Sequence, residues 1–358
     1  MSEPRVLLSD ENKGFGGAER HVLTLAGGLN SKGLLKGLAA RKTSWLAKNM
    51  GDLPFYPVGY RNEVDMLSVY SLYRKIKAEG VNVLHCIGHR DLVAAALARN
   101  LPGAPPTVLV KAEHSYPDPK LSPLFRWAYG QCQAVASVSE SLKQAVKSAV
   151  TPSASVEMPV IANGLEIPRS PQPAPELKGR EFRIGVLSPL RPGKGHSDFL
   201  KACAALNKKR QDLTLVLSIA GGGELQEPLQ EEARQLDLSV NFLGHVPDPL
   251  EYLSSVDLSV VPSHRETFSL VTLESLACGR PVVAADCDGI AELCRRSEDA
   301  VLYPVGDASA LAKALEEFCD NASERLRSAW SNSEKIRSEF SLESMTEQYC
   351  ELYRKLLS

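Results

Sequence analysis

Two carboxylates eight positions apart, Glu266 and Glu274, are the side chains of this sequence best placed to bind a polar ligand. The segment S-L-V-T-L-E-S-L-A-C-G predicts a helix with Glu274 in its middle. The residues three and four positions away from Glu274 are all apolar: Leu270, Val271, Ala277 and Cys278. Thr272 and Ser275 mark a second, more polar side of the helix. A carboxylate among apolar neighbours is costly unless a partner bonds to it. We therefore expect Glu274 to contact a ligand, with a structural glutamate bonded to backbone as the alternative.

The start of the same helix can hold phosphate. A strand pattern, D-L-S-V-V-P, precedes the helix, so Glu266 lies on the loop at a strand's carboxyl end. Ser269, Leu270 and Val271 present backbone N–H groups that lack partners inside a helix and favour an anion. Glu274, about one turn further on, can accept hydrogen bonds from ribose hydroxyls. A nucleotide fits this pattern.

A second loop brings positive charge. The sequence S-P-L-R-P-G-K-G-H follows a strand pattern and places Arg191 and Lys194 at its carboxyl end. Two cations there can neutralise a diphosphate, although two exposed surface cations are the alternative. Gly222, in the triplet after the next strand, allows close backbone approach, but such a triplet is often only a turn.

The first half of the chain offers fewer candidates. G-F-G-G-A-E opens a helical pattern, and Gly16 and Gly17 allow backbone to approach a ligand. The G-x-G-x-x-G spacing is missing, which disfavours a dinucleotide. His114 follows the strand pattern T-V-L-V-K-A and is a candidate for contacting a reacting sugar. We predict no metal site, because Asp286 and Asp288 end a strand without further acidic residues close in sequence.

Short apolar runs alternate with helical patterns, which predicts α/β architecture with parallel sheets. Strands are expected at residues 6–9, 81–87, 107–112, 134–138, 156–162, 182–187, 213–220, 240–244, 257–262 and 281–286. Four prolines in a segment without periodicity predict a linker. The predicted domains are residues 1–166 and 182–340, joined by the linker 167–181. A terminal helix is predicted over residues 341–358, and packing of this helix against the first domain is one of the arrangements considered.

Composition restricts the class of protein. A net charge of −2 over 358 residues gives no support for nucleic-acid binding. Eight cysteines without a C-x-x-C pair predict buried thiols in a reducing compartment. No secretory signal and no membrane-length apolar run is recognised, so we expect a cytoplasmic protein.

One basic segment stands apart from this average. Residues 20–51 hold no Asp or Glu but several Lys and Arg, interleaved with Leu34, Leu35, Leu38, Trp45 and Leu46. An anionic membrane surface is one candidate partner, which would make the protein peripheral on the inner face of the membrane. The alternative is a solvated basic rim around a core helix and strand.

The chain resembles the retaining glycosyltransferases of family 4, which have the GT-B fold of two Rossmann-like domains. The motifs that carry the resemblance are F-G-G-A-E-R near the N-terminus, E-H-S at 113–115, I-A-N-G-L at 161–165, K-G-H-S-D-F-L-K-A from Lys194, I-A-G-G-G-E-L at 219–225, V-N-F-L-G-H-V, and E-T-F-S-L-V-T-L-E. The last is the E-x7-E pattern of the family. The resemblance spans nearly the whole chain.

The resemblance implies a role for each candidate residue. Glu266, His114, Lys194 and Arg191 become catalytic candidates. Donor binding falls to Glu274, Gly16, Gly17, Gly222, Thr267, Phe268, Ser269, Leu270 and Val271. It also implies a first domain that binds the acceptor and a second that binds a nucleotide-sugar donor, with a UDP-sugar favoured and no metal needed.

The resemblance further implies transfer with retention to a cell-envelope glycan or glycolipid. The sequence departs from the family at Pro189, where an arginine is usual, and Arg191 lies two residues further on. Two alternatives stay open: a catalytically weak or silent sugar-nucleotide-binding protein, and an epimerase or hydrolase of the nucleotide-sugar.

Overall fold

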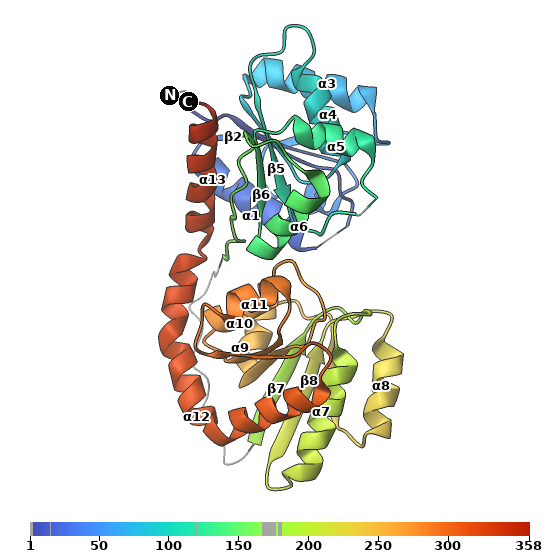
Figure 1. The fold of residues 1–358 in the computed structure, drawn as a ribbon, viewed down its shortest axis with the longest axis vertical. Helices are drawn as coiled ribbons and strands as arrows, with labels where there is room; N and C mark the ends of the chain where they lie inside the picture. Colours follow the sequence, from blue (N-terminus) through green and yellow to red (C-terminus); the bar gives the residue numbers. More distant parts are fainter. Residues whose placement is uncertain (1–2, 15, 119, 167–176, 178–180) are drawn as a thin grey trace. The chain divides into compact units, whose positions relative to one another are not determined.

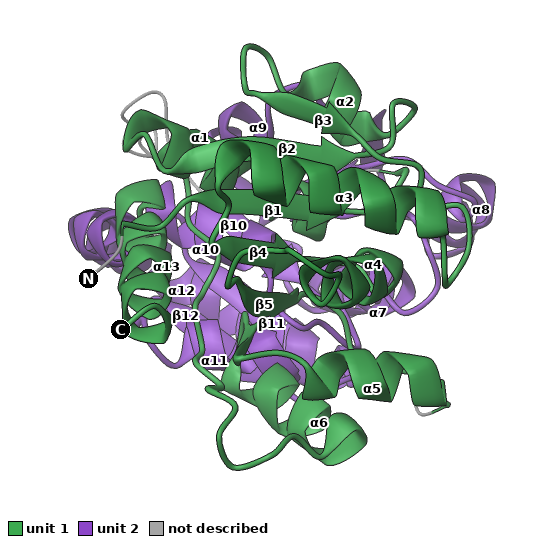
Figure 2. Cartoon of the chain, turned by 90° about the horizontal axis from the view of Figure 1, so that it is seen from above, with its two compact units in different colours: residues 1–166, 340–358 green, residues 167–339 purple. Residues whose placement is uncertain are grey.

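The computed structural model describes residues 3–14, 16–118, 120–166, 177 and 181–358. The chain divides into two compact units, unit 1 with residues 1–166 and 340–358, and unit 2 with residues 167–339 (Figures 1 and 2). All but two residues of the predicted linker 167–181 lie outside the described residues.

Unit 1 is built on a parallel sheet, six-stranded within the described residues, in the order β3-β2-β1-β4-β5-β6 (Figure 2). Its strands are β1 (Val6–Asp10), β2 (Leu35–Ala40), β3 (Phe55–Pro57), β4 (Val83–Cys86), β5 (Val108–Glu113) and β6 (Ala134–Ser137). Its helices are α1 (Gly17–Ser31), α2 (Trp45–Asn49), α3 (Met66–Glu79), α4 (Arg90–Arg99), α5 (Pro123–Gly130), α6 (Glu140–Val150) and α13 (Leu342–Leu356). The central strands are buried along their whole length, as expected of a sheet covered on both faces.

Unit 2 repeats the plan with the order β12-β11-β10-β7-β8-β9 in its described part. Its strands are β7 (Glu181–Leu187), β8 (Thr214–Ala220), β9 (Val240–Gly244), β10 (Leu258–Val261), β11 (Val282–Ala285) and β12 (Ala300–Tyr303). Its helices are α7 (His196–Lys209), α8 (Gln226–Gln235), α9 (Pro249–Ser255), α10 (Leu270–Ala277), α11 (Asp288–Cys294) and α12 (Ala308–Glu339). The predicted fold class, two doubly wound parallel sheets, is confirmed.

Strand order fixes where ligands can bind. In unit 1 the chain runs outward from β1 to β3 and then restarts beside β1 at β4, and in unit 2 it restarts beside β7 at β10. The connections therefore leave in opposite directions between β1 and β4, and between β7 and β10. Ligands of such sheets bind at the carboxyl ends of the strands at this reversal.

The end of the chain belongs to unit 1. Leu165 donates its N–H to the Phe340 carbonyl at 2.7 Å and accepts from Leu342 N–H at 3.0 Å. Helix α13 then packs on α1, where a Cβ on Gly28 would come within 2.2 Å of Thr346 Oγ1. Only glycine permits this close approach of the two helices.

One expected strand is absent from the described structure. Residues 156–162 make only isolated bridges, between Glu157 and Ala134 and between Val160 and Ser137. Pro159 lies between them and has no N–H to donate, which prevents a continuous ladder at the sheet edge. The strand predicted there is wrong.

The basic segment 20–51 is also corrected in part. Leu34, Leu35, Leu38 and Leu46 are at most 7% exposed and pack in the core of unit 1, so they cannot contact lipid. This burial agrees with the alternative, a basic rim around a core helix and strand. All eight cysteines are buried free thiols, as predicted.

Candidate functional site

A cavity of about 50 Å³ lies in unit 2 at the carboxyl ends of β7 and β10, the point where the strand order reverses. Ser188 and Pro189 line it from the loop after β7, and Ser263 and Glu266 from the loop after β10. Lys194, Ser269 and Val271 complete its polar and helical walls. The cavity thus collects several of the residues that the sequence analysis selected.

The two loops are tied to each other. Lys194 Nζ donates to Glu266 Oε1, and both side chains are only about one-quarter exposed. His264 donates its backbone N–H to the Gly193 carbonyl at 2.9 Å, and its Nε2 lies 2.6 Å from Asp198 Oδ2. The cation and the carboxylate are therefore held on a rigid frame.

A glycine makes this frame possible. Gly195 has φ 69°, a left-handed conformation that favours glycine, and a Cβ there would lie 1.9 Å from the Pro262 carbonyl oxygen. Gly289 plays the same part on the other side, since a Cβ would lie 2.1 Å from the Thr267 carbonyl oxygen. Its N–H donates to the Glu266 carbonyl at 3.1 Å, which fixes the backbone of the catalytic candidate.

The N-terminus of α10 points its first N–H groups toward this region. Ser269 Oγ accepts from Thr272 N–H at 3.2 Å, which caps the helix. The N–H groups of Leu270 and Val271 come earlier in the helix and have no intrahelical acceptor, and Val271 lines the cavity. Phe268, 9% exposed, is buried beneath the same turn. This geometry suits an anionic ligand.

Glu274 is 1% exposed, so its predicted burial is confirmed. The other side of the helix is buried too, because Thr272 and Ser275 are both 0% exposed. Ser275 Oγ donates to Val271 O at 2.7 Å and bonds Ser259 Oγ at 2.8 Å. The contrast between an apolar and a polar side is therefore corrected: α10 is buried on both sides, and hydroxyl pairs satisfy Thr272 and Ser275.

Of the two residues that depart from the family pattern, Pro189 and Arg191, only Pro189 lines the cavity. Pro189 lines the cavity, whereas the Arg191 side chain is exposed and lies outside its lining. The loop is held by the glycine segment after β8, since Leu190 N–H donates to the Gly222 carbonyl at 3.0 Å. In this conformation Lys194 is the cation that contacts the cavity.

The glycine triplet after β8 packs against this loop. A Cβ on Gly221 would lie 2.0 Å from the Ser188 carbonyl oxygen, and one on Gly223 would lie 2.3 Å from the Leu190 carbonyl oxygen. Gly222 between them is exposed, and nothing lies within 4 Å of its Cβ position. The close approach is therefore to the chain itself, and Gly222 leaves space for a ligand.

His196, two residues after Lys194, is a buried histidine that the sequence analysis did not select. It is 2% exposed at the start of α7, and burial, followed by the nearby Lys194 charge, lowers its pKa to about 4. The imidazole is therefore neutral at physiological pH. Its sequence signals were its place next to a glycine at a strand-to-helix turn and in the motif K-G-H-S-D-F-L-K-A.

In unit 1, His114 follows β5, is half-buried and lies against buried aromatic rings. Its ring lies 4.3 Å from that of His21, and His21 Nδ1 is 2.9 Å from Asn163 Oδ1. Burial, followed by the His21 charge, holds the His114 pKa well below its ordinary value. Gly16 caps α1 with extended backbone, and Gly17 begins that helix.

A second, larger hollow of about 440 Å³ lies at the carboxyl ends of the unit 1 strands. Its lining is charged and aromatic: Glu11, Asn12, Lys13, Arg41, Glu63, His89, Arg90 and Phe125. His89 stacks on Phe125 with centroids 5.0 Å apart. Glu11 accepts from the backbone N–H groups of His89 and Arg90, both at 3.0 Å. Sequence reasoning missed this group because its members follow five different strands.

Buried charge lies next to this hollow. Asp10 and Asp91 are 0% exposed, and burial raises the pKa of both carboxyl groups above the ordinary value. Lys111 is 1% exposed and lies 3.0 Å from Glu113, whose carboxylate also accepts from the Tyr129 hydroxyl. Several ionisable side chains are therefore buried next to the hollow of unit 1.

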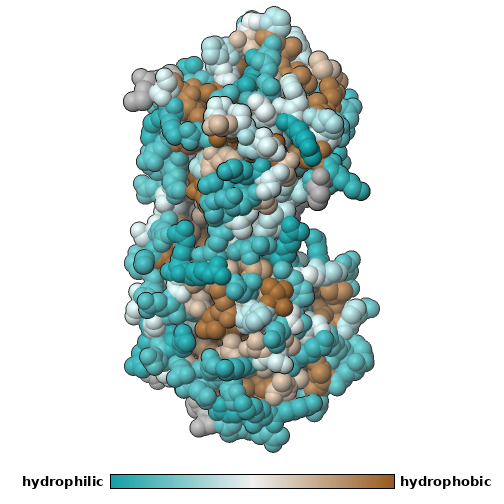
Figure 3. Space-filling model, viewed as in Figure 1, coloured by the Kyte–Doolittle hydropathy of each residue, from teal (hydrophilic) through white to brown (hydrophobic). Residues whose placement is uncertain are grey.

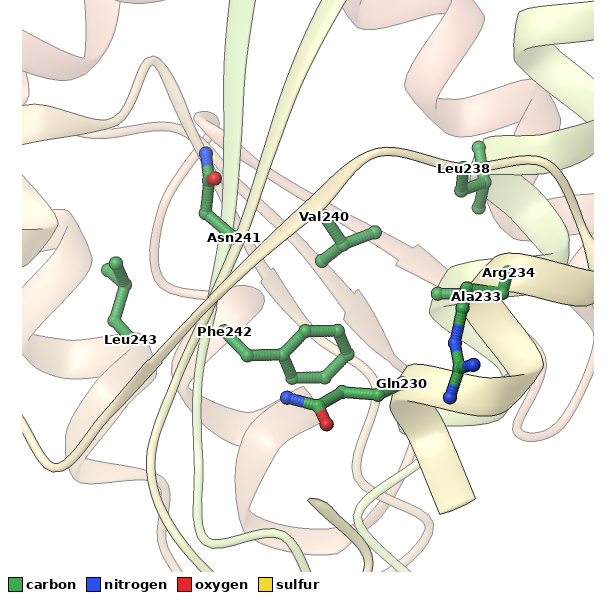
Figure 4. A pocket seen from close by; sticks show the side chains of 8 residues that line it. All are labelled: Gln230, Ala233, Arg234, Leu238, Val240, Asn241, Phe242 and Leu243. Atoms are coloured by element: carbon green, nitrogen blue, oxygen red, sulfur yellow. The ribbon is translucent and has the colours of Figure 1, made fainter. Parts of the chain in front are cut away.

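A third hollow, of about 540 Å³, lies between α8 and the edge strand β9 (Figure 4). Gln230 and Arg234 come from the helix, and Val240, Phe242 and Leu243 from the strand. Its residues lie along the strand and the helix, away from the strand-end loops that carry the candidate residues.

Both halves of the chain match glycosyltransferase families. Residues 15–169 match the family described as Glycosyltransferase Family 4, and residues 181–321 match Glycosyl transferases group 1. A glycogen synthase of Mycobacterium tuberculosis is 26% identical over 231 residues, which cover 63% of this chain and 55% of the relative. The lipopolysaccharide core biosynthesis glycosyltransferase LpsE of Rhizobium meliloti is 34% identical over 138 residues, 38% of this chain and 41% of the relative. The chain thus spans about half the length of these curated relatives.

Solved structures share the fold over the whole chain. The Anabaena protein HepE, crystallised with UDP, superposes with a TM-score of 0.81 at 20% identity, covering 98% of this chain and all of that one. HepE has also been crystallised with UDP-glucose. The two-unit architecture is therefore that of the GT-B fold.

Proposed function

We propose that this chain, which carries the two domains of a GT-B glycosyltransferase, transfers a sugar with retention from a nucleotide-diphosphate sugar to a cell-envelope glycan or glycolipid. The observation that carries the proposal is the cavity at the reversal point of unit 2, where Lys194, Glu266 and the N-terminus of α10 come together. UDP-sugar is the favoured donor, since UDP and UDP-glucose bind to the similarly folded HepE.

The donor-side chemistry follows from charge. The diphosphate leaves with an extra negative charge, which Lys194 and the N–H groups of Leu270 and Val271 can stabilise. These fixed donors do the work for which other enzymes recruit a divalent cation. In this proposal Glu274, which is buried in α10, bonds the ribose hydroxyls, and Glu266 contacts the donor sugar near its anomeric carbon.

Retention calls for attack on the face from which the diphosphate leaves. In this route the bond between the anomeric carbon and the phosphate oxygen breaks, and the acceptor oxygen bonds to that carbon. The departing phosphate oxygen takes the acceptor proton, so no strong protein base is required. Burial keeps His196 of unit 2 neutral, so its ring adds no positive charge that would hold the departing diphosphate.

The hollow of unit 1 is the proposed acceptor site. A face made of stacked His89 and Phe125 suits the apolar face of a sugar ring, and Glu11, Arg41 and Arg90 can bond its hydroxyl groups. The similarity to LpsE, a lipopolysaccharide core glycosyltransferase, favours an envelope glycan as the class of acceptor.

A donor screen tests the proposal. UDP-, GDP- and ADP-sugars are incubated with envelope glycan and glycolipid acceptors, and released nucleotide and product are measured. NMR of the anomeric proton then reports stereochemistry. Acceptor-dependent release with the donor's anomeric configuration in the product supports the proposal.

The same screen separates the alternatives. Binding of a nucleotide-sugar without release of the nucleotide identifies a silent sugar-nucleotide-binding protein. This alternative is considered because Pro189 stands where the family has an arginine and because the Arg191 side chain is exposed. Release or sugar isomerisation without acceptor identifies a hydrolase or epimerase. An inverted product contradicts retention while leaving the transferase assignment intact.

A further inference from the structure

Apolar side chains are concentrated on one exposed surface of unit 1. Val64, Met66, Leu67 and Tyr70 are 46–66% exposed. They make up four of the seven large apolar side chains that are exposed in the described part of the chain. The other three are scattered, at Trp127, Leu243 and Val305. Figure 3 shows brown, hydrophobic atoms at the end of the molecule where Figure 1 labels α3. Clusters of this kind mark interaction surfaces, whereas single exposed apolar residues are ordinary.

The cluster is presented by a firmly held helix. Asp65 caps α3, accepting from Leu67 N–H at 3.2 Å and from Ser68 Oγ at 2.7 Å. The inner side of α3 is buried, with Leu72 and Ile76 at 0% exposure. Exposure of the outer side is therefore a property of the folded helix and does not reflect loose packing.

Cations follow the apolar residues along the same outer side. Arg74 and Lys77 are exposed and lie four and seven positions after Tyr70, so all three fall on one side of the helix. From Met66 to Ala78 the sequence contains three cations and no acidic residue. An aromatic ring lies beside one of them, since Lys77 Nζ is 5.8 Å from the centroid of the Tyr73 ring. We call this surface, formed by Val64, Met66, Leu67, Tyr70, Arg74 and Lys77, the α3 face.

We propose that the α3 face docks unit 1 on an anionic lipid bilayer. The apolar first turns insert among the acyl chains, Tyr70 lies at headgroup depth, and Arg74 and Lys77 bind lipid phosphates. No helix in the described part of the chain is long and apolar enough to cross a membrane. The proposed contact is therefore interfacial.

Charge decides between lipid and a protein partner. Lysine is depleted at the buried centres of protein interfaces, whereas basic residues beside an apolar insertion are what an anionic surface attracts. Glu63 and Glu79 flank the surface, and Glu79 is paired with Lys75 at 3.4 Å, so its carboxylate is neutralised. A second copy of this chain would have to bury like charges against each other.

The proposal extends the proposed function by bringing the enzyme to a lipid-linked acceptor, but its test needs no catalysis. The full chain is sedimented with vesicles of phosphatidylcholine alone or mixed equally with phosphatidylglycerol, at low and high salt. The wild-type chain is expected to bind only the anionic vesicles, and less at high salt. The doubly substituted Met66→Ser, Leu67→Ser chain is expected to bind about tenfold more weakly. Each of Arg74→Gln and Lys77→Gln is expected to cost about fivefold.

Leu243→Ser, an exposed leucine of unit 2, is the matched control and should bind as the wild type does. UDP titration and the melting temperature confirm that each variant is folded. The proposal is overturned if the double variant sediments like the wild type, or if Leu243→Ser loses as much binding. It is equally overturned if no vesicle binds at low salt while the α3 variants abolish a concentration-dependent dimer. Vesicle binding without transfer activity sustains it and counts against the proposed function alone.

Discussion

Lys194 and Glu266 form an ion pair that joins the loop after β7 to the loop after β10, at the point where the strand order of unit 2 reverses. Both side chains are about one-quarter exposed and line the same cavity. An ion pair so accessible contributes little to stability. Its position instead suits a ligand-free state in which the two charged side chains hold each other in place. When the donor binds, its diphosphate takes the place of Glu266 as the partner of Lys194.

Replacing the acid of this pair should lower the rate without unfolding the chain. Glu266→Gln keeps the shape of the side chain but removes its charge beside the donor sugar, and we expect kcat to fall about 10²-fold. Steady-state kinetics and the melting temperature measure the two effects. Glu251→Gln, at an exposed position on α9, is the control and should keep full activity. Unchanged kcat in Glu266→Gln removes this residue from the mechanism.

Glu274 has a ligand-binding role and a structural role that can be separated. If it bonds the ribose, Glu274→Gln should raise the donor KM about tenfold while the acceptor KM and the melting temperature stay near wild type. A structural glutamate predicts the reverse, with lower stability and an unchanged donor KM. The two substrates are varied independently to read each KM.

Glycine at position 195 should be irreplaceable. Gly195→Ala places a Cβ against the Pro262 carbonyl at a left-handed φ, so we expect the free energy of unfolding to fall by about 1–3 kcal/mol and activity to fall with it. Gly222→Ala is the matched control, since nothing lies within 4 Å of its Cβ position. Urea unfolding of both variants makes the comparison. Equal stability of the two would contradict the close approach of the loops.

Much of this arrangement follows from sequence patterns. The strands around residues 6–9, 182–187 and 257–262 were predictable because buried parallel strands are nearly continuous apolar runs. The loops after them then placed Lys194 and Glu266 at the carboxyl edge of one sheet. Burial of Glu274 followed from its helical neighbours.

Other features could not be predicted because they depend on tertiary contacts. The polar side of α10 is buried by a hydroxyl pair with Ser259 on a neighbouring strand, which helical spacing cannot reveal. The hollow of unit 1 collects residues from the segments after five separate strands. Helix α3 has an exposed apolar side, so its pattern does not follow the rule that apolar residues face the core.

Acid should destabilise unit 1 through its buried histidines. Burial lowers the pKa of His21 to about 4, below its ordinary value of 6.5. The folded state therefore favours the neutral ring, and the associated stability is complete above pH 6.5 and is lost as the pH falls toward 4. His85 and His114 are shifted in the same direction, so their contributions add.

The measurement is urea unfolding between pH 7 and 4.5 in a Trp330→Phe background, where Trp45 and Trp127 report unit 1. His21→Asn should reduce the loss of stability on acidification, whereas His245→Gln, at an exposed position of unit 2, should leave it unchanged. An identical pH dependence in the His21 variant would show that its ring is already accessible to protons in the fold.

Calorimetric titration of UDP into the full chain tests most directly whether the unit 2 cavity is the donor site. Lys194→Met should weaken UDP binding about tenfold or more, because the variant loses the cation that contacts the diphosphate. Lys201→Met, on the exposed side of α7, should bind as tightly as the wild type. Equal affinity of wild type and Lys194→Met for UDP, or absence of UDP binding by the wild type, would contradict the account.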